Sequence, residues 1–351
     1  MINIKNINKI LIMELWGIGD IVLVSGVLGA LKKFNPNIRI VLLGKEHAKT
    51  VLSDNLHVDQ FINYDFPWTR LRRKYWLWQW DWIRLFRLII LLRAKKFDLI
   101  IDARGDIRNN FLSFLIGAKS RVGYDWGGGG YFLTDIVKSD RSKMHRVDAW
   151  RKLLEYVGIE RLNVEPIVKI SKKEDAWADD FLQTRGIDNN SLLVGIHPGA
   201  RSKARRWPLD RFAKVADFII SGYGAKVIVF IDPDDFGKDI PIRGPYVLMK
   251  LPLRQLISVL SKVNLFICND SGPMHLAAAL GVPLVSVFGP TEPRWFGPYG
   301  QNDAVIINEN FLCRPCFDNC YLKNNPCLYS IDVGQVNKVV KRSLDRFINH
   351  A

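Results

Sequence analysis

The sequence predicts an α/β protein in which parallel strands alternate with helices, and three stretches support this prediction. The apolar run from Val263 to Cys268 has the length of a buried strand. A polar loop, a short helix and a second strand at Pro283–Phe288 follow it, the order expected of a parallel pair. The same order occurs near the start, where an apolar run at Lys9–Leu15 precedes a helix over about Ile21–Phe34, and it begins again at Leu192–His197. We therefore expect two domains of this class.

The loop after the strand at 263–268 predicts an anion-binding site. Ser271, Gly272 and Pro273 form a tight loop before a helix over Met274–Leu280, and the first N–H groups of a helix have no partner within it. A diphosphate would fit there. Asp270 is too acidic to face phosphate directly, so we expect it to accept from backbone N–H groups or sugar hydroxyls. Taken singly, Ser271 is an ordinary helix cap, Asp270 a strand end and His275 a surface histidine.

Length and composition limit the possible functions. With 351 residues, 48% of them hydrophobic and 24% charged, the chain has room for two folded domains. The formal net charge of +15 suggests an anionic partner, which would be nucleic acid, an acidic membrane surface or a phosphorylated substrate. No apolar stretch is long enough to span a bilayer and no secretion signal is visible, so we expect a cytoplasmic protein.

Several motifs together resemble one enzyme family. The run D-S-G-P-M-H-L-A-A-A-L-G-V-P at 270–283 and F-G-P-T-E-P at 288–293 resemble the C-terminal signature of the ADP-heptose:lipopolysaccharide heptosyltransferases, glycosyltransferase family 9. W-G-I-G-D at 16–20, H-P-G-A at 197–200 and R-R-W-P at 205–208 extend the resemblance.

The resemblance implies a GT-B fold, with two Rossmann-like domains facing each other across a cleft. Residues 1–170 would bind the acceptor, and 171–351 would bind the nucleotide sugar. The last helix, Val333–Ile348, would return toward the first domain. Sugar transfer would proceed with inversion and without a catalytic cofactor.

Asp20 is the candidate general base. It follows the glycines at positions 17 and 19, and because position 22 is Val the stretch does not match the nicotinamide-binding fingerprint. An aspartate just inside a helix start stays ionised because the helix dipole favours its charge. The alternative is an ordinary N-cap aspartate.

The candidate donor-binding residues follow two strands of the second domain. A strand that ends in glycine and several cations is suited to neutralising a departing diphosphate. The family has a lysine shortly before Trp-Pro, and here Arg205 occupies that position, which leaves open whether Arg205 or Lys203 plays its part. By the same resemblance Asp234 would hold the ribose, with Asp232 and Asp235 as rivals.

Three arginines are candidates for binding an anionic acceptor. Arg104 and Arg108 follow the strand at Phe97–Asp102, and a solvated position is the alternative for both. Arg121 lies in A-K-S-R-V-G-Y-D, which resembles the family segment that carries an arginine toward the acceptor.

The segment 66–96 combines tryptophans with cations. Its five tryptophans suit a lipid headgroup region and its arginines suit lipid phosphates, so we predict peripheral docking on the inner face of the cytoplasmic membrane. A nucleic-acid patch or an aromatic stripe in the core is the alternative. The residues are Trp68, Trp76, Trp78, Trp80 and Trp82 with Arg70, Arg72, Arg73, Lys74, Arg84, Arg87 and Arg93.

A cysteine cluster predicts a structural metal site. Cys313, Cys316, Cys320 and Cys327 lie close together in a Pro-rich stretch, and in a reducing compartment four such thiols favour zinc or iron over disulfides. A set of reduced thiols is the alternative.

Together these features predict an inverting glycosyltransferase that moves a heptose or related sugar from an ADP-activated donor to a lipid-linked, phosphorylated glycan, with no nucleic acid partner. The alternatives are a sugar-nucleotide epimerase of the same fold and a membrane-associated protein that binds a sugar nucleotide without turning it over.

Overall fold

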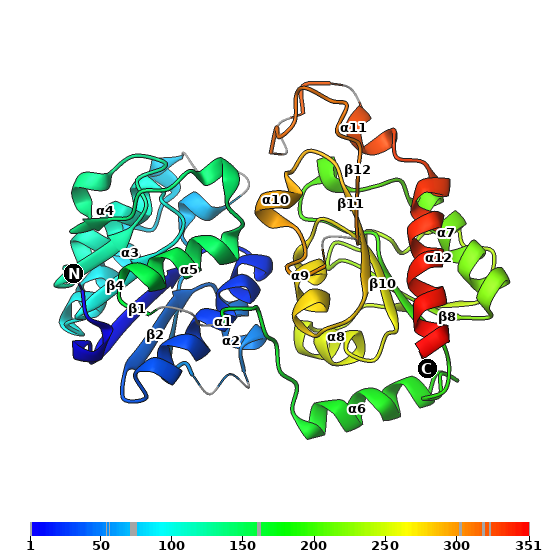
Figure 1. Ribbon diagram of the computed structural model, residues 1–351, viewed down its shortest axis with the longest axis horizontal. Helices are drawn as coiled ribbons and strands as arrows, with labels where there is room; N and C mark the ends of the chain where they lie inside the picture. Colours follow the sequence, from blue (N-terminus) through cyan, green and yellow to red (C-terminus); the bar gives the residue numbers. More distant parts are fainter. Residues whose placement is uncertain are drawn as a thin grey trace. The chain divides into compact units, whose positions relative to one another are not determined.

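Two six-stranded parallel sheets form the framework of the protein (Figure 1). The computed structural model describes residues 2–53, 55, 57–70, 76–159, 163–301, 304–317, 320–322 and 324–350. The chain divides into two compact units, Met1–Ile167 and Val168–Ala351, and each unit contains one sheet. The predicted α/β class is confirmed.

The first unit alternates strands and helices. Its elements are β1 (Lys9–Glu14), α1 (Ile18–Phe34), β2 (Arg39–Gly44), α2 (Glu46–Val51), β3 (Gln60–Asn63), α3 (Trp82–Ala94), β4 (Leu99–Asp102), α4 (Ile107–Ile116), β5 (Ser120–Gly123), β6 (Asp135–Ile136) and α5 (Arg146–Tyr156). Short 3₁₀ turns lie at η1 (Ile4–Asn6), η2 (Pro67–Thr69), η3 (Leu77–Gln79), η4 (Gly130–Phe132) and η5 (Arg141–Lys143).

The second unit has the same rhythm. Its elements are α6 (Lys172–Gln183), β7 (Leu193–His197), η6 (Lys203–Arg205), α7 (Leu209–Tyr223), β8 (Lys226–Phe230), β9 (Tyr246–Met249), α8 (Leu253–Leu260), β10 (Leu265–Asn269), α9 (Gly272–Ala279), β11 (Leu284–Phe288), α10 (Pro293–Phe296), β12 (Val305–Ile307), α11 (Pro326–Tyr329) and α12 (Val333–His350).

Alternate strand residues supply the core of each unit, because successive side chains of a strand point to opposite faces. In the first unit Leu11 and Met13 of β1 pack with Leu85, Leu88 and Leu92 of α3. In the second unit α12 lies against α7 and β11, and its buried face is Val336, Val340 and Leu344. The last helix therefore belongs to the core of the second unit, and its return toward the first stays a prediction.

Both sheets share one strand order. The first runs β3-β2-β1-β4-β5-β6, and the second runs β12-β11-β10-β7-β8-β9, which is the same order when each unit is counted from its own first strand. In such sheets the connections on the two sides of the central strand pair run in opposite directions. The place between these two strands where the direction changes is called the switch point, and ligands bind there, beyond the carboxyl ends of the strands. The switch points lie between β1 and β4 and between β7 and β10.

Candidate active site

Asp20 lies at the switch point of the first unit. Helix α1 begins three residues earlier than its sequence predicted, so Asp20 falls in the first turn and its Oδ2 accepts from the backbone N–H of Gly17 at 3.2 Å. Gly17 is the N-cap and Asp20 is the third helical residue, so this bond belongs to a capping box, and Asp20 does not occupy the N-cap position that the alternative interpretation expected. The other carboxylate oxygen, Oδ1, points to a different partner.

Arg104 supplies that partner. Its Nη1 lies 3.3 Å from Asp20 Oδ1, and its guanidinium lies 4.2 Å from the centroid of the Trp16 ring. The two side chains are 24% and 23% exposed, so the ion pair keeps access to solvent. Of the three arginines predicted for the acceptor, Arg104 is the one for which the structure shows a contact with Asp20.

Arg108 and Arg121 have other partners. Arg108 binds both oxygens of Asp106, with Nε 2.8 Å from Oδ1 and Nη2 2.6 Å from Oδ2. Arg121 donates to the carbonyls of Phe132 at 2.8 Å and Ala118 at 2.9 Å. The Arg108 contact lies at the start of α4 and the Arg121 contact ties β5 to η4, and a role in acceptor binding stays a prediction for both.

Three buried ionisable groups of the first unit were missed as site residues from the sequence. Glu14 ends β1 with 7% exposure, and burial, followed by the charge of Asp20, raises its pKa well above the ordinary value. Burial also raises the pKa of Asp102 to about 6 and lowers that of Arg146 to about 9. A charged residue inside the otherwise apolar run of β1 was the available signal for Glu14.

The tryptophans of segment 66–96 divide into two groups. Trp68 is buried, where its Nε1 donates to Asn109 Oδ1 at 3.1 Å, and Trp80 packs against the same core. Trp76, Trp78 and Trp82 are 42%, 76% and 52% exposed. The core alternative therefore holds for two of the five rings. Arg72, Arg73 and Lys74 lie outside the described residues.

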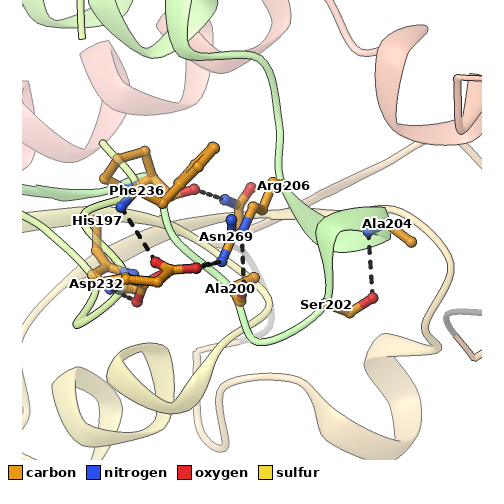
Figure 2. Close-up of polar contacts among 10 residues, drawn as sticks. His197, Ala200, Ser202, Ala204, Arg206, Asp232, Phe236 and Asn269 are labelled. Atoms are coloured by element: carbon orange, nitrogen blue, oxygen red, sulfur yellow. Dashed lines mark hydrogen bonds and ion pairs between the residues drawn. The ribbon is translucent and has the colours of Figure 1, made fainter. Parts of the chain in front are cut away.

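The switch point of the second unit contains the basic loop 198–207. Asn269, the fully buried last residue of β10, fastens both ends of this loop: its Nδ2 donates to Pro198 O at 2.6 Å, and its Oδ1 accepts from Trp207 N at 3.0 Å. Within the loop, Ser202 Oγ accepts from Ala204 N at 3.3 Å, as Figure 2 shows. The loop is thus held in a defined shape beside α9.

The neighbouring arginines Arg205 and Arg206 of the loop contact different groups. Arg205 Nη1 lies 3.0 Å from Asp270 Oδ2, and Thr291 Oγ1 donates to the same oxygen at 2.6 Å. Arg206 donates to Ala200 O at 2.8 Å and lies 3.4 Å from Asp232 and 3.1 Å from Asp234 (Figure 2). The side chain of Arg205 therefore lies beside Asp270 at the predicted anion site. Arg206 instead pairs with Asp232 and Asp234, which follow β8 and form an acidic cluster.

The acidic cluster separates the rival ribose candidates. Asp232 Oδ1 lies 3.2 Å from the buried His197 Nε2, so Asp232 is tied to the end of β7 (Figure 2). Asp234 has a side chain that is 60% exposed, and Asp235 pairs with Lys250 at 2.6 Å. Exposure favours Asp234 over Asp232 as the residue that a ligand could reach.

The remaining donor candidates lie around the start of α9. Ser271 is the N-cap, and its buried Oγ has no hydrogen-bond partner within the described part of the chain. Gly272 opens the helix, and His275 is buried in the first turn, which excludes the surface position considered from sequence. Lys203 is exposed in η6 and makes no ion pair with any described residue.

The cysteines do not form the predicted metal site. No three His, Cys, Asp or Glu side chains are close enough to hold a metal ion among the residues that the structure describes. Cys320 Sγ donates to Leu322 O at 3.3 Å, and burial raises the pKa of the Cys327 thiol. Arg314 instead anchors this stretch, donating to the carbonyls of Gly289, Asn308 and Thr291. A structural zinc or iron is therefore not supported.

Comparison with known proteins gives a consistent family match. The sequence model of glycosyltransferase family 9 (heptosyltransferase) matches residues 85–325, more than half of the chain, so Asp20 lies before the matched stretch. Lipooligosaccharide heptosyltransferase 2 of Campylobacter jejuni is 31% identical over 166 residues, which are 44% of this chain and 52% of that protein. The chain thus spans about half the length of this curated relative.

Solved structures match over almost the whole chain. A glycosyl transferase family 9 protein from Veillonella parvula has a TM-score of 0.77 and 25% identity, with 97% of each chain covered. The E. coli heptosyltransferase WaaC, solved with ADP-2-deoxy-2-fluoro heptose, has a TM-score of 0.68 and 20% identity, with 95% of this chain and 99% of that one covered. The likeness confirms the predicted GT-B fold.

Proposed function

The chain belongs to glycosyltransferase family 9, and from that premise we propose that it transfers a heptose, or a related sugar, from an ADP-activated donor to a lipid-linked glycan such as a lipopolysaccharide core. The observation that carries this proposal is the basic loop 198–207, fixed at the switch point of the second sheet beside the start of α9. That position suits the diphosphate of a nucleotide sugar. The ADP-sugar analogue bound by WaaC, a protein of the same fold, supports this donor class.

The reaction we propose is a single displacement. Asp20 takes the proton of an acceptor hydroxyl, whose oxygen forms a bond to the anomeric carbon from the face opposite the diphosphate. The bond between that carbon and the diphosphate oxygen breaks, and ADP leaves with the electron pair. The anomeric configuration is inverted, and the proton on Asp20 returns to solvent.

Charge on the departing ADP would be neutralised by groups of the second unit. The side chain of Arg205 contacts Asp270, just before α9, and the first N–H groups of α9 around Gly272 add partial positive charge. The exposed Lys203 is available to join them. One well-placed hydrogen-bond donor to a developing negative charge lowers the activation free energy by about 3 kcal/mol. Asp234 is the proposed ribose ligand. No step passes through a metal.

The acceptor is proposed to meet the first unit. Arg104 would hold an anionic group of the acceptor near Asp20, with Arg108 and Arg121 as further candidates. The acceptor hydroxyl would then reach the carboxylate oxygen that Arg104 already contacts at 3.3 Å.

Peripheral attachment to the inner face of the cytoplasmic membrane is part of the proposal. None of the described helices is long and apolar enough to cross a bilayer. The surface we propose for docking consists of exposed apolar residues on η3 and α3, with Arg84, Arg87 and Arg93 on the same helix to meet anionic lipids. Its members are Trp76, Leu77, Trp78, Trp82, Ile83, Phe86, Ile90 and Leu91.

Helix α4 extends this docking surface. It packs against α3, and its exposed residues Ile107, Phe111 and Phe114 follow a helical spacing of four and three, so they form one stripe. Apolar stripes on two neighbouring helices offer more area to a lipid interface than the tryptophans alone.

The experiment that tests the reaction measures ADP release from ADP-heptose with and without a lipopolysaccharide-core acceptor. We expect release that depends on the acceptor, together with a glycosylated product detected by mass spectrometry. Conversion of the donor to an isomer without acceptor would indicate an epimerase, and a donor left intact under all conditions would indicate a binding protein.

A further inference from the structure

Thr291 is a fully buried polar residue in the loop that follows β11. Its hydroxyl donates to Asp270 Oδ2 at 2.6 Å, the oxygen that also receives Arg205 Nη1 at 3.0 Å. The Asp270 side chain is itself only 4% exposed. One buried carboxylate oxygen thus joins the loop after β11 to the basic loop after β7.

This arrangement restricts the guanidinium of Arg205. A hydroxyl removed from water is costly unless it is bonded, and a bond to a carboxylate is stronger than one between neutral groups. Thr291 therefore fixes the orientation of Asp270, and Asp270 in turn fixes the position at which Arg205 can donate. An arginine on a loop would otherwise sample many rotamers.

The neighbouring Asn269 restrains the backbone of the basic loop 198–207. It bonds to both ends of the loop, at Pro198 and at Trp207, and it is fully buried. Asn269 thus fixes the loop ends, and the contact with Asp270, which Thr291 supports, restrains the Arg205 head group within that fixed loop.

We infer that Thr291 is a positioning residue, which acts through Asp270 to hold Arg205 where the diphosphate of the donor develops charge. The inference rests on the proposed function, in which the loop 198–207 receives the diphosphate. Charge builds up on the leaving group in the transition state, so a fixed cation lowers the barrier more than it tightens binding of the intact donor. A cation displaced from this position would no longer stabilise the transition state more than the bound donor.

The test replaces Thr291 with valine, which has the same shape without the hydroxyl, and with serine, which restores it. For T291V we expect kcat to fall about tenfold, the loss typical of one hydrogen bond to a charged group, with a change in donor KM of less than about threefold. T291S should recover most of the rate. Thermal unfolding shows whether T291V remains folded, and Kd for ADP gives a readout that needs no turnover.

A double-mutant cycle separates positioning from general support of the fold. If Thr291 acts through Arg205, T291V should change kcat little once Arg205 is already alanine, so the two losses should not add. Additive losses in R205A/T291V, or wild-type kinetics for T291V, would overturn the inference. Absence of acceptor-dependent ADP release from the wild-type protein would instead overturn the proposed function.

Discussion

The guanidinium of Arg104 lies between the carboxylate of Asp20, 3.3 Å away, and the ring of Trp16, 4.2 Å from its centroid. The contact joins the first turn of α1 to the segment after β4. The preceding strands, β1 and β4, are neighbours in the sheet although they are far apart in sequence. Gly105 adopts a φ of +64°, and a Cβ there would lie 3.0 Å from Tyr124 Cβ. The backbone that presents Arg104 therefore requires a glycine.

Replacement of Asp20 tests the proposed base. D20N keeps an oxygen for the Gly17 N–H but cannot take up a proton, so kcat should fall by roughly 10²- to 10⁴-fold. Affinity for ADP, measured by calorimetry, should stay within about twofold, since the proposed nucleotide site lies in the second unit. Asp210, exposed in the first turn of α7, provides the control D210N. A D20N enzyme as fast as the wild type would exclude Asp20 as base.

Replacement of Arg104 tests the ion pair. R104A removes both the countercharge and the contact with Trp16, and we expect kcat/KM for the acceptor to fall at least about tenfold. R104K should recover only part of the loss, because an ammonium cannot keep the planar contact and the ion pair together. R294K changes an arginine whose side chain is 79% exposed, and it serves as the control. Full recovery in R104K would show that charge alone matters.

Asp102 makes stability depend on pH. Its pKa is about 6 in the fold against 3.8 ordinarily, so folding favours the protonated carboxyl. Its stabilising effect is complete below about pH 4 and is lost as the pH rises through 6. D102N cannot ionise, and at pH 8 it should exceed the wild type by up to about 3 kcal/mol in unfolding free energy, the difference vanishing near pH 4.

Chemical denaturation at both pH values measures this effect. D180N, at an exposed aspartate of α6, is the control and should show no such difference. An equal effect of D102N at pH 4 and pH 8 would contradict the prediction.

The docking surface predicts reversible binding to anionic vesicles. The triple variant W78S/W82S/F86S should lose at least about tenfold in affinity for phosphatidylglycerol-containing vesicles, and F111S/F114S should lose less. Added salt should weaken the binding of the wild type. Activity on a short water-soluble acceptor should be unchanged in both variants.

The control for docking is L312S, because Leu312 is fully exposed in the second unit. Vesicle affinity equal to that of the wild type in W78S/W82S/F86S would show that η3 and α3 do not contact the membrane.

Much of the fold follows from local sequence, whereas the partners of individual side chains do not. Apolar runs and helix-stop signals predicted the central strands, among them Leu193–His197, the first strand of the second sheet. Edge strands such as Gln60–Asn63 and Tyr246–Met249 were missed, because their short, partly polar sequences carry little periodicity.

Side-chain contacts depend on strand order, which the sequence alone did not supply. Asp20 was identified, but its ion pair with Arg104 requires β1 and β4 to be neighbours. Thr291 was part of a quoted motif without a role, since its link to Asp270 crosses from β11 to β10. Trp68 was assigned to a membrane surface because composition does not show which rings the core takes up.

The repeated strand order gives each unit its own core and its own switch point. Under the proposed roles of the two units, chimeras that exchange residues 1–167 with those of a relative should change acceptor choice, while donor choice should stay with residues 168–351. Such modularity would let substrate preference diverge on one side of the reaction without rebuilding the other.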